Sequence, residues 1–287
     1  MPGELSLSLQ ARLALEQAGF GFTHSLGQNF IFDEELLEKI ASCAGADEGV
    51  NVLEIGPGAG MLTAIMARRG AKVLAIELDR TLEPVLDRLI GGFDNVRIIY
   101  ADALKTDLGL LCSESFGDES FIICANLPYY ITADFIMKAV TLARPAESVT
   151  LMLQKEAAQR VLATPGEEGW CALSAVVSFA CEGRKLFDVP RDCFTPAPHV
   201  DSALIRLDRR SEKAVPSDRE RAFVRFIKSA FSMRRKTLVN NLSSAYDLSK
   251  ALVAQRIEGA GFDPRVRGEA LSITELSRVF TALTGDV

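Results

Sequence analysis

The tetrapeptide Asn126-Leu127-Pro128-Tyr129 holds the residues whose types and order are chemically most telling. The side-chain oxygen of Asn126 and a main-chain carbonyl of the Leu127-Pro128 segment can each accept one hydrogen from the exocyclic amine of adenine. That amine is a poor nucleophile, because its lone pair is delocalised into the ring, and two acceptors would draw the nitrogen toward a tetrahedral geometry. Pro128 stiffens the segment, and Tyr129 offers a face for base stacking. The tetrapeptide predicts an amine positioned for attack without a strong general base; the alternative is an ordinary proline-containing turn.

A glycine-rich segment, Glu54-Ile-Gly-Pro-Gly-Ala-Gly60, stands between an apolar run and a helical pattern. Glycines at such a turn let a ligand approach the backbone closely. The G-x-G-x-G spacing differs from the G-x-G-x-x-G of nicotinamide dinucleotide sites, which favours S-adenosylmethionine. Glu77 suits a ribose diol, and Asp102 can accept a hydrogen bond from an adenine amino group. The alternatives stay open: Glu77 as a charge at a helix N-terminus, Asp102 as the start of a turn, and Glu54 without an assigned role.

Alternating apolar runs and helical patterns place these residues at the ends of strands. Buried strands are expected over 50–55, 72–77, 96–100, 121–125 and 149–154. Helices are expected over 61–70, 80–90 and 133–143. Such alternation predicts βαβ units, right-handed crossovers and a parallel sheet, which is an α/β, Rossmann-like fold. Two later apolar runs, near 172–180 and 200–207, could add strands at the edge of the sheet.

From about Pro216 the pattern changes to helical. Five apolar residues follow the i, i+3, i+4, i+7, i+8 spacing of an amphipathic helix: Phe223, Phe226, Ile227, Ala230 and Phe231. Charges cluster over 208–217, where Pro216 precedes a possible N-cap, Ser217. The sequence therefore predicts a catalytic domain over 1–210 and a small helical domain over 211–287.

The charge of the chain is unevenly distributed. The net charge is −6, yet residues 204–240 hold eleven basic and four acidic side chains, which gives +7 there and −13 elsewhere. A concentrated basic patch on an acidic body suits phosphate binding, because the local field matters more than the sum. The alternative is a solvated helical face.

Bulk properties fit a globular protein. The 287 residues are 48% hydrophobic and 24% charged, and no apolar run approaches the roughly 20 residues of a membrane span. We expect no secretory signal, because the first residues lack a continuous apolar stretch. The six cysteines never form C-x-x-C and only two histidines exist, so we expect no metal and a reducing cytoplasm.

Several further segments, taken with the tetrapeptide, resemble the KsgA family of ribosomal-RNA adenine N6,N6-dimethyltransferases. They are Ser25-Leu-Gly-Gln-Asn-Phe30, Leu53–Gly60, Gln154-Lys-Glu156, Phe194-Thr-Pro-Ala-Pro-His-Val-Asp-Ser202 and Phe231-Ser-Met-Arg-Arg-Lys-Thr-Leu238. The resemblance covers nearly the whole chain. It implies methylation of two adjacent adenosines in a stem-loop near the 3′ end of small-subunit (16S) rRNA. It also implies S-adenosylmethionine as the donor, a 30S particle or its precursor as the partner, and a role in 30S biogenesis; we expect a monomer.

Carried over by position, the resemblance implies three groups of site residues. The cofactor would be held by Gln28, Asn29, the backbone at Ile31, Gly56, Gly58, Glu77, Asp102 and Asn126. A flipped target base would meet Asn126, Leu127, Pro128 and Tyr129, with Phe194 stacking on its opposite face. The RNA backbone would be gripped through Arg221, Arg225, Lys228, Arg234, Arg235 and Lys236.

The chain departs from the family pattern at three positions. Ile31 replaces the commoner Leu, Ala125 stands where Gly is usual, and Tyr130 stands where Asn is common. Tyr130 could narrow the mouth of the acceptor site. Three alternatives remain: a large-subunit rRNA adenine methyltransferase of the antibiotic-resistance type, a non-catalytic ribosome-assembly or transcription factor on the same fold, and an oxidoreductase.

Overall fold

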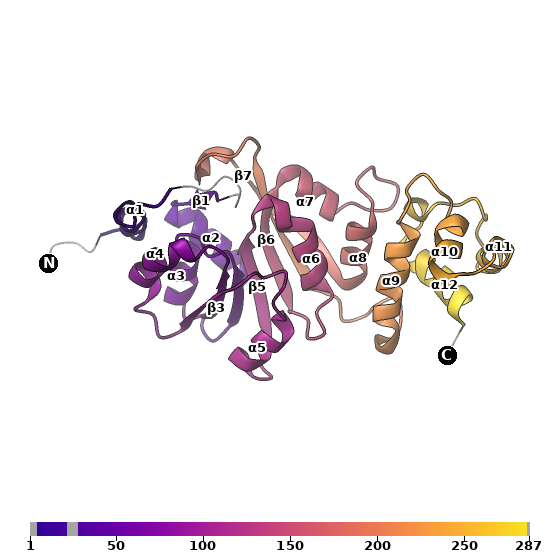
Figure 1. The fold of residues 1–287 in the computed structure, drawn as a ribbon, viewed down its shortest axis with the longest axis horizontal. Coiled ribbons are helices and arrows are strands. Elements are labelled where there is room, and N and C mark those ends of the chain that lie inside the picture. The colour runs from indigo at the N-terminus through magenta and orange to yellow at the C-terminus, as the bar shows by residue number, and fades with distance from the viewer. Residues whose placement is uncertain (1–4, 22–27, 286–287) are drawn as a thin grey trace. The chain divides into compact units, whose positions relative to one another are not determined.

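A computed structural model describes residues 5–21 and 28–285 (Figure 1). The chain divides into two compact units, each with its own core. The first comprises Met1–Ala158 and Arg184–Arg209, and the second Gln159–Gly183 and Arg210–Val287. The third crossing between the units lies at Arg209/Arg210, one residue before the predicted division at 210/211. Residues 159–183, which the sequence placed in the first domain, lie in the second unit because their helix packs on a C-terminal helix.

The first unit is built on a seven-stranded sheet in the order β4-β3-β2-β5-β6-β9-β7. The strands are β2 (Asn51–Ile55), β3 (Lys72–Glu77), β4 (Val96–Tyr100), β5 (Phe121–Asn126), β6 (Ser148–Gln154), β7 (Cys181–Val189) and β9 (Ser202–Arg209). The first five in the sheet order are parallel, and β9 pairs antiparallel with β6. The chain order reverses between β2 and β5, so a crevice is expected beyond their carboxyl ends. The expected Rossmann-like fold is confirmed.

Helices flank this sheet and bury alternate strand residues. They are α1 (Leu7–Gln17), α2 (Glu34–Ala44), α3 (Met61–Arg68), α4 (Glu83–Ile90), α5 (Leu108–Phe116), α6 (Thr132–Val140) and α7 (Lys155–Val161), which crosses into the second unit. Val52, Val73 and Cys124 pack with α1 to α4 in one hydrophobic cluster. Their neighbours along the strands, such as Leu53 next to Val52 and Ile123 next to Cys124, are also buried and face the other side of the sheet.

A small two-stranded sheet lies beside the main one. The strands β1 (Phe30–Ile31) and β8 (Phe194–Thr195) pair antiparallel, with Ile31 opposite Phe194. The sequence patterns did not indicate this pairing, because two residues are too few to show a period. Its effect is to tie the segment near residue 30 to a loop more than 160 residues later.

The second unit is helical. Its elements are α8 (Ala172–Ala180), α9 (Glu220–Ala230), α10 (Leu238–Tyr246), α11 (Lys250–Gly259) and α12 (Ile273–Thr284). The predicted stripe on α9 is confirmed, since Phe223 and Phe226 are fully buried. The Phe223 ring lies 5.0 Å from Phe179 of α8 and 5.2 Å from Phe280 of α12, measured between centroids.

Two expectations about strands need correction. The run near 172–180 is the helix α8 rather than a strand, with Cys171 at its N-cap and Ser174 closing a capping box. A short apolar run does not distinguish a buried helix from a buried strand. The run near 200–207 does form β9, but β9 lies between β6 and β7, so β7 is at the edge. Within the described residues, no helix is long and apolar enough to cross a membrane.

Candidate active site

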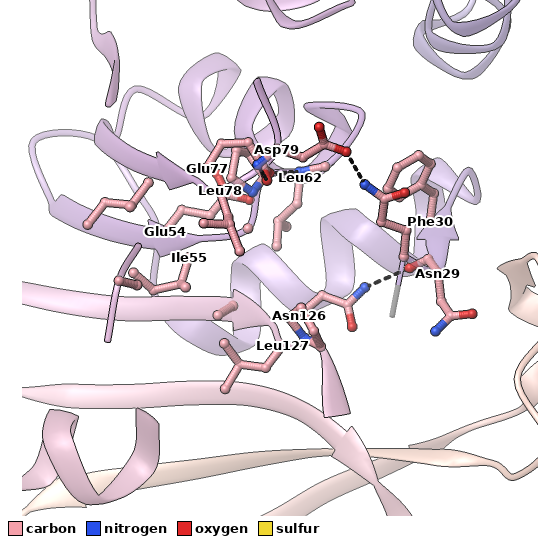
Figure 2. Close-up of a pocket in the computed structure, with 18 of the residues that line it drawn as sticks. Asn29, Phe30, Glu54, Ile55, Leu62, Glu77, Leu78, Asp79, Asn126 and Leu127 are labelled. Atoms are coloured by element: carbon pink, nitrogen blue, oxygen red, sulfur yellow. Dashed lines mark hydrogen bonds between the residues drawn. The ribbon is translucent and has the colours of Figure 1, made fainter. Parts of the chain in front are cut away.

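A cavity opens at the carboxyl ends of the central strands, at the point where the sheet order reverses (Figure 2). Most of the predicted cofactor and acceptor residues line it together: Gln28, Asn29, Ile31, Gly56, Gly58, Glu77, Asp102, Asn126, Leu127, Pro128 and Tyr129. They come from five separate segments of the first unit. Of the resembling segment 25–30, residues 25–27 lie outside the described part of the chain.

The glycine loop after β2 is shaped by two backbone positions that require glycine. Gly56 has φ +68°, and a Cβ placed there would project into open space at the cavity wall. Gly58 has φ +57°, and its Cβ would lie 2.9 Å from Cε1 of Phe30. Side chains at both positions would be strained, and one at Gly56 would fill the cradle. The loop therefore fits a ligand that lies directly on the backbone.

Glu77 is fixed at the end of β3 by the backbone around it. Its Oε2 accepts a hydrogen bond from Gly58 N at 3.1 Å, and its Oε1 accepts one from Asp79 N at 2.8 Å. Burial raises the pKa of Glu77 above its ordinary value, and these two backbone donors oppose that rise. Each carboxylate oxygen can still accept a further bond from a hydroxyl. The geometry suits a vicinal diol.

Glu54, which the sequence left without a role, is a buried acid beneath the glycine loop. Its side chain lines the cavity and Oε2 accepts a 2.6 Å hydrogen bond from Thr63 Oγ1. Burial raises the pKa of Glu54 to about 8, with Thr63 opposing the rise and the negative charge of Glu77 adding to it. A pKa near 8 favours the protonated form of Glu54 at neutral pH.

Asp102 stands just after β4 and remains ionised. Its Oδ1 accepts a 2.9 Å bond from Leu104 N, and Lys105 Nζ lies 3.3 Å from Oδ2. The Leu104 amide and, secondarily, Lys105 lower the pKa of this carboxyl. Asp102 thus faces the cavity as an anionic hydrogen-bond acceptor.

Asn126 ends β5, and its amide is oriented by the segment that crosses above it. Nδ2 donates a 3.1 Å hydrogen bond to the main-chain carbonyl of Asn29 (Figure 2). This leaves Oδ1 as the side-chain atom that can accept a bond in the cavity. Asn126 is half-buried and Leu127 is buried, so a donor would be held there with little access to bulk water.

The structure adds Leu78 and Asp79, which the sequence analysis did not single out, to the predicted residues Gln28 and Tyr130. Gln28 Nε2 donates a 2.6 Å hydrogen bond to Asp79 Oδ2, which joins the segment before β1 to the turn after β3. Leu78 and Tyr130 also line the cavity and remain 50% and 56% exposed, which makes them its open apolar rim. Two acidic residues, Glu77 and Asp79, stand where β3 ends, and this pattern in the sequence could have pointed to Asp79 as a partner of Gln28.

Phe194 is the one predicted acceptor residue that the structure does not bring into the cavity. It does not line the cavity and is only 4% exposed. It belongs to the hydrophobic cluster of the first unit, where β8 pairs with β1. Its ring is a core aromatic in this conformation, and the expected stacking on a target base opposite Tyr129 stays a prediction. Tyr129 does line the cavity.

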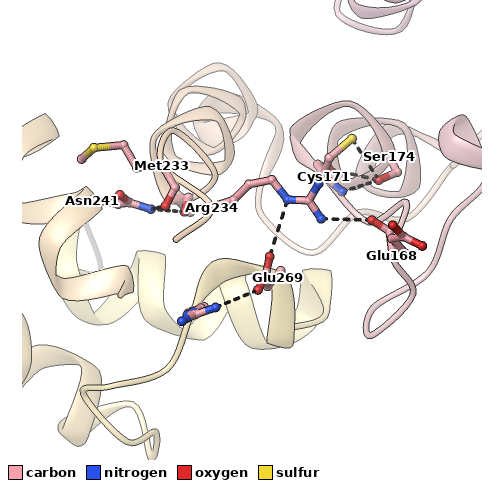
Figure 3. Close-up of polar contacts among 9 residues, drawn as sticks. Glu168, Cys171, Ser174, Met233, Arg234, Asn241 and Glu269 are labelled. Carbon is pink, nitrogen blue, oxygen red and sulfur yellow. Dashed lines mark hydrogen bonds and ion pairs between the residues drawn. The ribbon is translucent and has the colours of Figure 1, made fainter. Parts of the chain in front are cut away.

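The predicted RNA-contacting side chains divide into free and engaged ones. Arg221, Arg225 and Lys228 are exposed on α9, and among the described residues no carboxylate pairs with them. Arg234 instead donates a 3.0 Å bond to the main-chain carbonyl of Glu168, and its Nε lies 3.7 Å from Glu269 (Figure 3). It is therefore partly a structural residue of the second unit.

Other basic side chains of residues 204–240 are also occupied. Arg206 pairs with Asp208 at 2.7 Å and donates to the carbonyl of Cys43 at 2.8 Å, and Lys213 pairs with Glu220 at 2.6 Å. Arg219 bonds Thr284 Oγ1. The basic surface left for a partner is accordingly smaller than the local charge of +7 suggested.

Comparison with known proteins decides the family. Residues 19–280 match the family described as "Ribosomal RNA adenine dimethylase". The chain belongs to this family. A member of it is a methyltransferase that takes its methyl group from S-adenosylmethionine, and the expected enzyme class is confirmed. An oxidoreductase is excluded.

Individual relatives agree with this membership. The chain is 41% identical to "Ribosomal RNA small subunit methyltransferase A" of Geobacillus thermodenitrificans over 273 residues, covering 94% of this dimethylase and 93% of the relative. It is 40% identical to the protein of the same name from Streptococcus pneumoniae, with 96% of each chain covered.

Two solved structures share the fold over most of their length. The dimethylase is similar to a dimethyladenosine transferase from Plasmodium falciparum, with TM-score 0.68, 26% identity, and 85% and 94% of the two chains covered. It is also similar to the 23S rRNA methyltransferase ErmE, with TM-score 0.65, 25% identity, and 89% and 99% covered. Fold similarity alone therefore does not separate small-subunit from large-subunit substrates, whereas the relatives near 40% identity carry the small-subunit name.

Proposed function

We propose that this dimethylase converts two adjacent adenosines near the 3′ end of small-subunit rRNA to N6,N6-dimethyladenosine. The observation that carries the proposal is the orientation of Asn126, whose amide nitrogen is engaged by Asn29 and whose oxygen is left for the cavity. The name shared by the relatives supports the small subunit over the large one.

The residues that line the cavity offer the hydrogen-bond acceptors that S-adenosylmethionine requires. Glu77 would accept hydrogen bonds from the ribose hydroxyls, and Asp102 would accept one from the adenine amino group. The backbone at Gly56 and Gly58 would face the cofactor directly. The segment of Gln28, Asn29 and Ile31 would cover its methionine end. When bound, the cofactor supplies an electrophilic methyl group on a sulfonium centre.

The residues of this chain would act on the acceptor amine by positioning. Asn126 Oδ1 and a carbonyl of the Leu127-Pro128 segment would each accept one N6–H, which directs the nitrogen lone pair away from the ring plane. Tyr129 would stack on the base, a contact worth about 1–3 kcal/mol and comparable to the cost of unstacking a nucleotide. The methylated ammonium is acidic enough to lose its proton to solvent, so no histidine is required.

Basic side chains of the second unit would contact the phosphate backbone of the RNA. Arg221, Arg225, Lys228, Arg235 and Lys236 are exposed cations suited to phosphate contacts, and Arg234 would contribute through the part of its side chain that stays exposed. We propose a 30S particle or its precursor as the partner, a cytoplasmic location, a monomeric enzyme and a role in 30S biogenesis.

The test is methylation of ribosomal particles with radiolabelled S-adenosylmethionine. Unmethylated 30S subunits should yield N6,N6-dimethyladenosine in small-subunit RNA, and Asn126→Ala should slow its formation by about 100-fold or more. Label confined to 50S RNA would replace the proposal with a large-subunit enzyme. Binding of cofactor and of 30S particles without transfer would leave an assembly factor.

A further inference from the structure

The turn that carries Asp102 is held together internally by its own backbone. Asp102 Oδ1 accepts from Leu104 N, and the Asp102 carbonyl accepts from Lys105 N at 3.0 Å and Thr106 N at 2.9 Å. These bonds shape the turn but do not attach it to the rest of the fold. Two of its carbonyls, those of Leu104 and Thr106, point instead toward a neighbouring helix.

That helix supplies one cation to both carbonyls. Lys138 Nζ donates to Leu104 O at 2.8 Å and to Thr106 O at 2.6 Å. Lys138 lies in the last turn of α6, whose residues Phe135 and Ile136 are fully buried. The ammonium therefore projects from a helix that is anchored in the core. It is half-buried, and a charged donor forms strong hydrogen bonds where water is partly excluded.

The position of α6 links this contact to the acceptor tetrapeptide. The 3₁₀ turn of Tyr129–Ile131 follows the tetrapeptide directly, and α6 continues from it at Thr132. Lys138 therefore connects the element that leaves the acceptor site to the turn that holds Asp102. No sequence motif pointed to Lys138.

We propose that Lys138 is a positioning residue for adenine recognition: by holding the Leu104 and Thr106 carbonyls, it fixes the Asp102 carboxylate at the cavity wall. The assignment rests on the proposed contact between Asp102 and the cofactor's adenine. Without the ammonium, two partly buried carbonyls lose their donor and the turn opens locally. Asp102 then no longer presents an oxygen to the adenine amino group in a fixed place.

Lys105 provides a matched control in the same turn. Its ammonium lies 3.3 Å from Asp102 Oδ2, but its side chain is 86% exposed. Such surface pairs contribute little. Lys105→Met and Lys138→Met remove the same charge near the same carboxylate, yet only the second removes the bonds to the two carbonyls.

The experiment compares two ligands by calorimetry on the full-length protein and its variants. S-Adenosyl-L-homocysteine has the 6-amino group that Asp102 would accept, and S-inosyl-L-homocysteine carries a 6-oxo group in its place. We expect Lys138→Met to weaken binding of the adenosyl ligand about tenfold and to leave the inosyl ligand nearly unchanged, so that discrimination between them falls. Lys105→Met should keep the discrimination of the unsubstituted protein.

Three results would overturn the assignment. Equal losses for both ligands would show a general structural role, and unchanged affinity of Lys138→Met for both ligands would show no role. The same loss in Lys105→Met would show that charge alone matters. If Lys138→Met does not fold, Lys138→Gln, which keeps an N–H donor but is too short to reach both carbonyls, is measured instead. Failure of the unsubstituted protein to bind S-adenosyl-L-homocysteine is a different result, since it overturns the cofactor site itself and the role of Lys138 with it.

Discussion

The side-chain amide of Asn126 donates to the main-chain carbonyl of Asn29 across 97 positions of sequence. A carboxamide has its donor and acceptor on opposite branches, so a partner for nitrogen determines where the oxygen points. The segment before β1 consequently does more than cover a ligand. It orients the residue that would accept the target amine.

Asn126→Ala should lower kcat by about 100-fold or more, the usual cost of losing a preorganised hydrogen-bond group at the reacting atoms. Methyl transfer to 30S subunits at saturating substrates measures it. Asn29→Ala is the matched variant, because it keeps the carbonyl that orients Asn126. Its kcat should fall far less, even where its KM for the cofactor rises. Equal losses of kcat in the two variants would contradict the prediction, because they would show that the Asn29 side chain matters to transfer as much as the Asn126 amide does.

The buried acid Glu54 makes stability depend on pH. Its pKa is about 8 in the folded protein, above the ordinary 4.5. Between pH 4.5 and pH 8 the folded state therefore carries a proton on Glu54 that the unfolded state has lost. Stability contributed by the neutral acid is complete below pH 4.5 and is lost as pH rises toward 8.

Glu54→Gln, a neutral side chain that can still accept from Thr63, should remove this dependence. Urea unfolding at pH 5.5 and pH 8 should therefore show a smaller loss of stability in the variant, by a few kcal/mol at most. The control is Glu119→Gln, which changes an exposed carboxylate. It should lose about as much stability between pH 5.5 and pH 8 as the unsubstituted protein does. A Glu54→Gln protein with the same loss as the unsubstituted protein would show that Glu54 is ionised in the fold.

Phe194 should behave first as a core residue. Because its ring is buried in the cluster of the first unit, Phe194→Ala should destabilise the protein by about 3–5 kcal/mol, measured by urea unfolding. Phe194→Leu should cost much less and permits a kinetic test. A raised KM for RNA in a stable Phe194→Leu protein would indicate that the ring also reaches the base when RNA is bound. A Phe194→Ala protein of undiminished stability would show that the ring is not part of the core.

The neighbouring residues Arg234 and Arg235 of the second unit should differ in what they contribute to protein stability and to RNA binding. Arg235 is exposed, so Arg235→Ala should reduce the slope of log affinity for RNA against log salt concentration by about one, with little change in unfolding temperature. Arg234→Ala should also lower the unfolding temperature, because Arg234 is bonded to Glu168 and lies near Glu269. Filter binding over a salt series and thermal unfolding measure the two effects. Identical behaviour of the two variants would contradict the division.

The sequence by itself determined the five parallel strands of the sheet, the glycine loop and the acceptor tetrapeptide. These depend on local signals: buried strands appear as apolar runs, the positive φ of Gly56 and Gly58 requires glycine, and Pro128 stiffens its own segment. Because the carboxyl ends of parallel strands share one edge of the sheet, the sequence alone predicts that Glu77, Asp102 and Asn126 surround one site.

Only the tertiary structure decided what depends on pairs of residues far apart in the chain. The burial of Phe194 follows from the short β1–β8 pairing, and the engagement of Arg234 follows from a carbonyl 66 positions away. The contacts from Lys138 to Leu104 and Thr106 follow from the packing of α6, and the raised pKa of Glu54 follows from complete burial. None of these has a local period or spacing, because each arises only when separate elements meet and exclude water.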